Sequence, residues 1–219
     1  MIVVFLGPPG SGKGTQADIL AVRYGFYHFD TGARLRTEIA SGSELGQTIA
    51  SFTDNGNLVP IEVIRELVMT FMRNTDSRRI MFDGFPRNLE QARVLDEGLE
   101  ELGGDLDFAL YLEISEDSLI DRIVNRRFCP ECGEIYNLGS RPPRQPGRCD
   151  IDGAGLYQRS DDTEEVFGNR LKVYLEQTVP VLEYYKARQR LYKIDGDQDI
   201  EQVAEAVAGL IGLECNDSA

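Results

Sequence analysis

Hydrophobic positions follow two patterns along the chain, short apolar runs and longer segments with helical spacing. Runs rich in β-branched and aromatic residues, which are typical of buried strands, occur at 2–6, 27–29, 79–83, 108–114 and 191–195. Segments with apolar residues at helical spacing occur at 14–23, 61–73, 165–188 and 200–213. Because strands alternate with helices, we predict an α/β fold in which a parallel sheet has helices on both faces.

Polar turn signals divide the rest of the chain. Asp30-Thr31-Gly32 is typical of a helix start, and further short helices are separated at 41–43 and 54–57. From residue 128 to 158 the chain is rich in Gly, Pro, Arg and Cys and has no helical period. A loop of this length without internal structure is uncommon, so we expect an inserted lobe held by a local cross-link.

The first apolar run leads directly into a glycine-rich loop at 7–15. Gly7, Gly12 and Lys13 fit the P-loop spacing, in which backbone N–H groups and a helix N-terminus surround phosphate oxygens. Position 14 departs from that pattern because it is glycine, and the hydroxyl follows at Thr15. The alternative is an ordinary strand–helix turn, but the adjoining strand and the lysine favour phosphate binding.

A carboxylate, Asp83, ends the run at 79–83. It is typical of a Walker-B-type residue that holds the waters of a Mg²⁺ ion, although strand ends also carry simple turn aspartates. Gly84 and Arg87 follow closely in the sequence. We therefore expect the backbone at Gly84 to come close to the same site and the guanidinium of Arg87 to lie beside it.

Four arginines flank the Cys-rich segment, two before it and two after it. Arg122 and Arg126 are four residues apart, which predicts that they share one helix face before the lobe. Arg159 and Arg170 come after it. Single arginines are often solvated surface groups, but four around one inserted lobe favour a phosphate clamp.

The cysteines predict a metal site in the lobe. Cys129 and Cys132 are followed by Cys149 and Asp152, in the pattern C-x2-C-x16-C-x2-D. This spacing is typical of two zinc knuckles with one carboxylate ligand, and four protein ligands indicate a structural metal. Asp150 is a rival fourth ligand, and reduced surface cysteines are the alternative to a metal site.

Composition narrows the class of protein. The chain has 219 residues and a formal net charge of −14, which argues against general nucleic-acid binding. No run approaches the roughly 18 apolar residues that span a bilayer, and we expect no secretory signal in the short first run. His28 is the only histidine, and we expect a packed or exposed side chain rather than a catalytic base. Cys215, near the acidic tail, is expected to have no role in the metal site.

The motifs have an order and spacing found together in one family. They are 7–16, Thr31-Gly32 with Leu35-Arg36, 41–46, 83–87 with Gln91, and 159–162. Over residues 1 to about 196 they resemble the adenylate kinases, in the long form with a zinc-bearing lid. Gly14 is typical of nucleoside monophosphate kinases, whereas Ala33 stands where the family usually has an acidic residue.

The resemblance implies a P-loop-type parallel five-stranded sheet flanked by helices, with an inserted metal-binding lid and a helical AMP-binding subdomain. The implied division is a core of residues 1–29, 60–121 and 164–219, an AMP-binding subdomain of 30–59, and a lid of 122–163. The implied reaction is the reversible, Mg²⁺-dependent conversion of ATP and AMP into two ADP, with structural Zn²⁺ in the lid. We expect a monomer, because the lid must move freely. We also expect a cytoplasmic protein with no nucleic-acid or membrane partner.

The resemblance also implies a role for individual residues. ATP would be bound by Gly10, Ser11, Gly12, Lys13, Gly14, Thr15, Arg122, Arg126 and the backbone near Lys193. AMP would be bound by Thr31, Arg36, Asn57, Val59, Gly84, Arg87, Gln91, Arg159 and Arg170. Catalysis would rest on Lys13, Asp83, Arg87, Arg122, Arg126, Arg159 and Arg170. Asp161 and Asp162 would help to close the lid, and the metal would be held by Cys129, Cys132, Cys149 and Asp152.

Two other functions remain open at this point. One is a kinase for another monophosphate such as UMP or CMP, although the long lid and Gln91 favour AMP. The other is a nucleotide-binding or zinc-sensing protein without catalysis. The sequence has no Asn-Lys-x-Asp guanine-reading motif, and an arginine clamp would be superfluous in a sensor.

Overall fold

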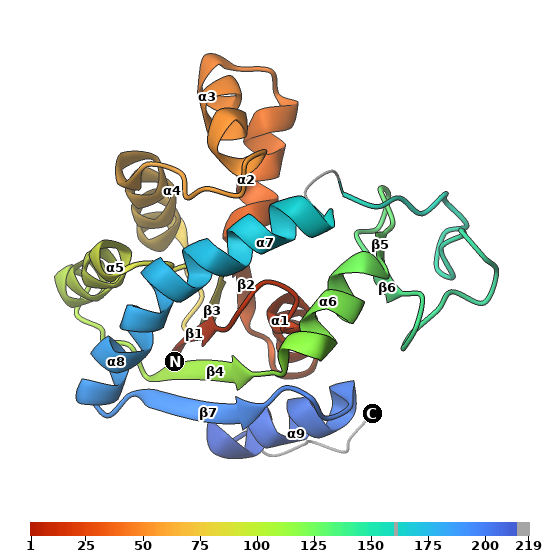
Figure 1. Ribbon diagram of the computed structural model, residues 1–219. Helices are drawn as coiled ribbons and strands as arrows, with labels where there is room; N and C mark the ends of the chain where they lie inside the picture. Colours follow the sequence, from red (N-terminus) through yellow and green to blue (C-terminus); the bar gives the residue numbers. More distant parts are fainter. Residues whose placement is uncertain (160–161, 214–219) are drawn as a thin grey trace.

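The predicted strands pair into one parallel sheet in the computed structural model, which describes residues 1–159 and 162–213 (Figure 1). The sheet contains β1 (Ile2–Leu6), β2 (Tyr27–Asp30), β3 (Ile80–Asp83), β4 (Phe108–Glu113) and β7 (Leu191–Asp195). Its strand order is β2-β3-β1-β4-β7, and every neighbouring pair is parallel. The predicted fold class is therefore confirmed.

Both faces of the sheet are buried, as the continuous apolar runs require. Successive side chains of a strand point to opposite faces, so Val4 and Leu6 join one core while Val3 and Phe5 join the other. All four are at most 1% exposed. The central strand β1 is thus fixed from both sides, which holds the loop that follows it.

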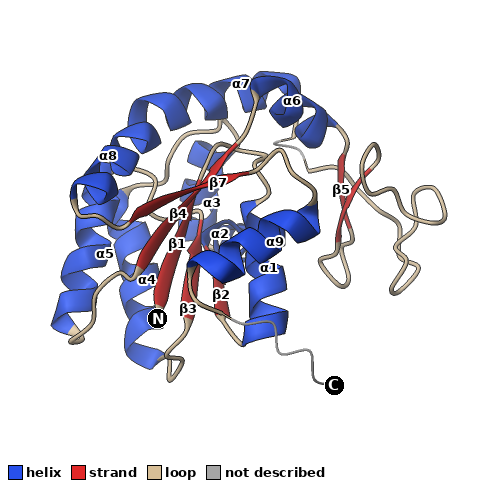
Figure 2. Ribbon diagram, turned by 90° about the horizontal axis from the view of Figure 1, so that it is seen from below, coloured by secondary structure: helices blue, strands red, loops and turns tan. Residues whose placement is uncertain are grey.

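The helices divide between the two faces (Figure 2). One face is covered by α1 (Lys13–Tyr24) and α9 (Ile200–Leu210), and the other by α4 (Ile61–Asn74), α5 (Leu89–Glu101) and α8 (Val179–Ala187). The helix predicted at 200–213 ends at Leu210, three residues earlier than expected. Gly212 takes a positive φ of 72°, which ends the helical backbone. Among the described residues, no helix has the length and apolar character needed to cross a membrane.

Two short helices, α2 (Thr31–Ala40) and α3 (Glu44–Thr53), pack against each other at one end of the sheet (Figure 1). The predicted helix start at Asp30 is confirmed: its carboxylate accepts a hydrogen bond from the N–H of Ala33 at 2.9 Å. Ser43 caps α3 in the same way, through the N–H of Gly46.

The Cys-rich segment extends away from the sheet as a small lobe (Figure 1). The lobe begins after α6 (Glu116–Val124) with β5 (Arg126–Phe128), which forms an antiparallel pair with β6 (Ile135–Asn137). The prediction that Arg122 and Arg126 share one helix face is wrong, because α6 ends at Val124 and Arg126 pairs with Asn137 in the β-ladder. The two arginines therefore come from different elements.

The prediction of a single helix at 165–188 is also wrong in the middle of that range. The segment instead forms α7 (Glu164–Val173), a π-helical turn η1 (Tyr174–Thr178) and α8. Pro180 lies at the start of α8 and has no N–H to donate to the carbonyl four residues earlier, which favours a change of helix type at this point. The wide turn leaves Tyr174 and Thr178 buried.

Candidate active site

The loop after β1 leads into the N-terminus of α1 and leaves backbone N–H groups available. Gly12 caps α1 in a left-handed conformation, and no side chain accepts a hydrogen bond from the first turn. Such an end attracts anions. The ammonium of Lys13 folds back over the loop, where it donates to the carbonyls of Gly7 and Pro8, each at 2.9 Å.

A cavity of about 1030 Å³ opens above this loop, a volume at the upper end for ligand sites. It brings together most of the residues singled out from the sequence. Those that line it are Gly10, Ser11, Gly12, Lys13, Gly14, Thr15, Arg36, Asp83, Gly84, Arg87, Arg122, Arg126, Arg159 and Arg170. The cavity is therefore rich in cationic groups, although the chain as a whole is acidic.

Lys13 and Asp83 both line the cavity, and their opposite charges interact. Burial lowers the pKa of Lys13 to about 8; Asp83 opposes this effect, and Arg87 adds to it. Burial acts to raise the pKa of Asp83, but His28 and Lys13 outweigh it and hold that pKa below the ordinary value. A Cβ at position 14 would lie 3.3 Å from Asp83 Oδ2, so Gly14 leaves room for this carboxylate beside the loop.

His28 lies beside this carboxylate, a position that its local sequence does not predict. His28 lies on β2, next to the strand that carries Asp83. Its Nδ1 is 2.8 Å from Asp18 Oδ1, and its Nε2 is 3.8 Å from Asp83 Oδ2. Burial acts to lower the pKa of His28, but the two carboxylates raise it to about 10. The pairing depends on strand order, which the local sequence does not show.

The arginines are held by acceptors from distant parts of the chain. Arg122 donates to the carbonyls of Gly196 at 2.8 Å and Ser11 at 3.3 Å. Arg126 makes a two-pronged ion pair with Asp162, whose side chain is fully buried.

The same carboxylate also faces a second arginine. Arg170 Nη1 lies 3.8 Å from Asp162 Oδ1. Arg159 lies over the ring of Phe128, with 3.4 Å between the guanidinium carbon and the ring centroid. One carboxylate at the lobe thus orients Arg126 and Arg170, while an aromatic face supports Arg159.

Arg87 is positioned by its own neighbourhood. Its Nε donates to the carbonyl of Gly84 at 2.8 Å, and its backbone N–H donates to Gln91 Oε1 at 2.7 Å. The hydroxyl of Thr178, on η1, donates to the carbonyl of Arg87 at 2.7 Å. Thr178 is a second residue that sequence reasoning missed, because the contact joins segments 91 residues apart.

The remaining candidates for AMP differ in exposure. Arg36 lines the cavity and lies 3.5 Å from Asp30. Thr31 is buried beside the cavity, and its hydroxyl finds no hydrogen-bond partner among the described residues. Gln91 is buried and is not among the residues that line the cavity. Gly56 and Leu58 line it, so the predicted residues Asn57 and Val59 alternate with lining positions.

Lys193 is not among the residues that line the cavity. It lies on β7, and its ammonium pairs with Glu113 at 2.8 Å. The end of the cavity near β7 is instead lined by residues 196–201. Asp161 and Cys215 lie outside the described residues.

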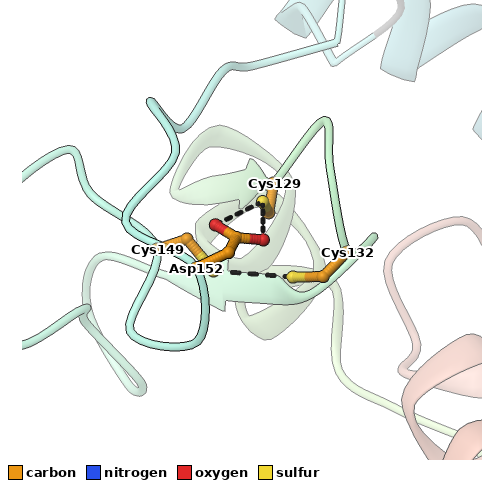
Figure 3. A group of neighbouring side chains, drawn as sticks. All are labelled: Cys129, Cys132, Cys149 and Asp152. Carbon is orange, nitrogen blue, oxygen red and sulfur yellow. Dashed lines mark hydrogen bonds between the residues drawn. The ribbon is translucent and has the colours of Figure 1, made fainter.

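The predicted metal ligands come together in the lobe (Figure 3). The ligand atoms of Cys129, Cys132, Cys149 and Asp152 all lie within 4.8 Å of one another. Asp152 faces Cys129 Sγ at 3.2 and 3.4 Å, and the N–H of Ala154 is the main cause that lowers its pKa to about 2. Three thiols and an ionised carboxylate fit Zn²⁺. Asp150, the rival ligand, instead accepts a hydrogen bond from the N–H of Arg144.

The pairing of His28 predicts an imidazole that stays protonated at neutral pH. Since its pKa is raised from 6.5 to about 10, the charge persists well above the usual titration range. The ring ¹H shifts of this single histidine should stay at imidazolium values from about pH 5.5 to 8.5. In Asp18→Asn, which removes one carboxylate, the titration should move to lower pH. A midpoint near pH 6.5 in the parent protein would contradict the pairing.

Comparison with known proteins agrees with this geometry. The family model described as adenylate kinase matches residues 5–190. An adenylate kinase of Thermosipho melanesiensis is 45% identical over 96% of this chain and 99% of its own length. Adenylate kinases of Archaeoglobus fulgidus and Fervidobacterium nodosum are 41% and 40% identical over 96% and 97% of this chain, and over 98% of each relative. The chain therefore belongs to the adenylate kinase family of phosphotransferases.

Proposed function

We propose that this chain carries out the adenylate kinase reaction, the reversible, Mg²⁺-dependent transfer of a phosphoryl group from ATP to AMP that yields two ADP. The observation that carries the proposal is the convergence of Lys13 and several arginines, from separate elements, on one cavity above the P-loop. A phosphoryl group between two nucleotides needs cations on all sides. A site that only held one nucleotide would not need them.

The ATP side is the loop and the residues that face it. The backbone of residues 10–15 and the N-terminus of α1 would bind the ATP phosphates, with Lys13 bridging toward the transferred group. Arg122 and Arg126 would neutralise charge from the lobe side. The backbone after β7, close to Lys193, would receive the adenine, through residues 196–201 rather than the Lys193 side chain.

The AMP side is formed by α2 and the segment after β3. Arg36 and Arg87 would bind the AMP phosphate, and the buried hydroxyl of Thr31 would find its partner in the nucleotide. Gly84 and Gln91 set the conformation of Arg87. The backbone at Asn57 and Val59 would complete this side, while Arg159 and Arg170 would contact the phosphates that are shared by both nucleotides.

Asp83 fits the role of holding Mg²⁺ that arrives with ATP. Its pKa is held low, so the carboxylate stays ionised, and it lies beside Gly14 of the loop. Oxygen ligands suit this cation, which usually keeps several waters. Bound there, Mg²⁺ would neutralise charge on the ATP phosphates.

The chain's own residues contribute position and charge rather than proton transfer. The acceptor is already a phosphate anion, so a general base is not required. Arg126 and Arg170 share Asp162 and therefore place their guanidinium groups together at the lobe end of the cavity. Closure of the lobe would exclude water, which could otherwise accept the phosphoryl group.

The lobe is proposed as the lid, residues 122–163, and the segment 30–59 as the AMP-binding subdomain, with residues 1–29, 60–121 and 164–219 as the core. Zn²⁺ held by Cys129, Cys132, Cys149 and Asp152 would be structural, because four protein ligands leave no position for a reacting water. We propose a cytoplasmic monomer that binds ATP, AMP and ADP and no nucleic acid or membrane.

The preference of the enzyme among nucleoside monophosphates tests the proposed function. With ATP and Mg²⁺, turnover should be fastest with AMP and much slower with UMP or CMP in a coupled assay of ADP formation. Lys13→Ala and Arg87→Ala should each lower kcat/KM by about 10²–10³-fold, because each removes a cation from the transition state. Arg65→Ala, at an exposed position on α4, is the matched control. Near-parental turnover in either site variant, or a preference for UMP or CMP, would overturn these assignments.

Removal of the metal tests its structural role. The protein should contain about one zinc per chain, and a chelator should lower Tm by about 5 °C or more, because metal binding contributes to folding. Activity at moderate temperature should remain. Asp152→Asn should lower zinc content, whereas Asp150→Asn should not. Loss of nucleotide binding at a temperature where the chelated protein is still folded would instead support a zinc sensor.

A further inference from the structure

The turn after α3 forms a fixed end to that helix. The N–H groups of Gly56 and Asn57 donate to the carbonyls of Thr53 and Phe52 at 2.9 and 3.0 Å. The amide of Asn55 donates to the carbonyl of Ser51 at 3.1 Å. These bonds use the last carbonyls of α3 and not the carbonyl of Asn55.

That carbonyl meets α7. The side-chain amide of Asn169 donates a hydrogen bond to the carbonyl of Asn55, and it lies 3.5 Å from Asn57 Oδ1. The two segments are more than 110 residues apart in the sequence. A carbonyl can only accept, so the contact requires a hydrogen-bond donor at position 169, which the amide of Asn169 supplies.

Gly56 brings the two backbones close enough for this bond. Its φ is +72°, and an added Cβ would lie 2.8 Å from Arg170 Cγ and 3.3 Å from the carbonyl oxygen of Val166. The turn therefore rests directly on one turn of α7, with no space for a side chain between them.

The contact between Asn169 and the turn joins two parts of the cavity wall. Asn169 itself does not line the cavity. Gly56 and Leu58 line the cavity from the AMP side, and Arg170 lines it from α7. Arg170 is the neighbour of Asn169 in sequence and faces Asp162 at the lobe. A displacement of the turn from α7 would thus move the AMP side away from Arg170.

We propose that Asn169 is a positioning residue for AMP: its amide ties the C-terminal end of α3 to α7, so that the segment 30–59 and Arg170 close around the AMP phosphate as one unit. This inference rests on the proposed function, because it assumes that segment 30–59 binds AMP. It assigns a task to a residue that belongs to no phosphate-binding motif.

The test is a comparison of the two substrates in Asn169→Ala. A hydrogen bond of ordinary net strength corresponds to about fivefold in a binding constant. KM for AMP should rise about fivefold, while KM for ATP, kcat at saturating AMP and Tm should stay near the parental values. Asn169→Gln keeps the amide donor and should recover most of the affinity for AMP. Lys172→Ala, at an exposed position of the same helix, is the matched control.

An unchanged KM for AMP in Asn169→Ala overturns the proposal, and so does an equal rise in KM for both nucleotides. A rise that Asn169→Gln shares in full also overturns it, because the amide donor would then not matter. If the parent protein itself does not turn over AMP, the proposed function fails instead, and the two failures are told apart in the same assay.

Discussion

Several cationic side chains line one cavity, and the protein must hold them there before any phosphate is present. The cost of holding them is visible at Lys13, whose pKa falls to about 8 mainly through burial; nearby arginines lower it further, and Asp83 opposes the fall. Four of these cations are held by acceptors: Lys13 by the carbonyls of its own loop, Arg122 by Gly196, and Arg126 and Arg170 by Asp162. Nucleotide phosphates would add anions between these cations.

The parallel sheet makes the arrangement possible. The glycine-rich loop follows β1 and Asp83 ends β3, and these strands are neighbours, so the loop and this carboxylate meet at one edge of the sheet. The next strand, β2, adds His28 behind Asp83. The burial of β1 from both faces keeps the loop in place. The arginines come from α2, α6, the lobe, α7 and the segment after β3, so movement of these parts would change the charge in the cavity.

Local patterns predicted the elements and much of the site, whereas contacts between distant segments escaped them. The apolar runs predicted the sheet, and C-x2-C-x16-C-x2-D predicted the four residues that cluster in the lobe. The helical spacing of Arg122 and Arg126 misled, because α6 stops at Val124 and the β-ladder begins. The hold of Thr178 on Arg87 depends on tertiary structure that no local pattern encodes.

A cavity that moves a phosphoryl group between two nucleotides has to exclude water, and the stoichiometry of ATP consumption distinguishes these two acceptors. It can be followed by ³¹P NMR with and without AMP. Two ADP should form for each ATP consumed when AMP is present, with negligible loss of ATP when it is absent. One ADP and one inorganic phosphate for each ATP, at a rate that does not depend on AMP, would contradict transfer between two nucleotides.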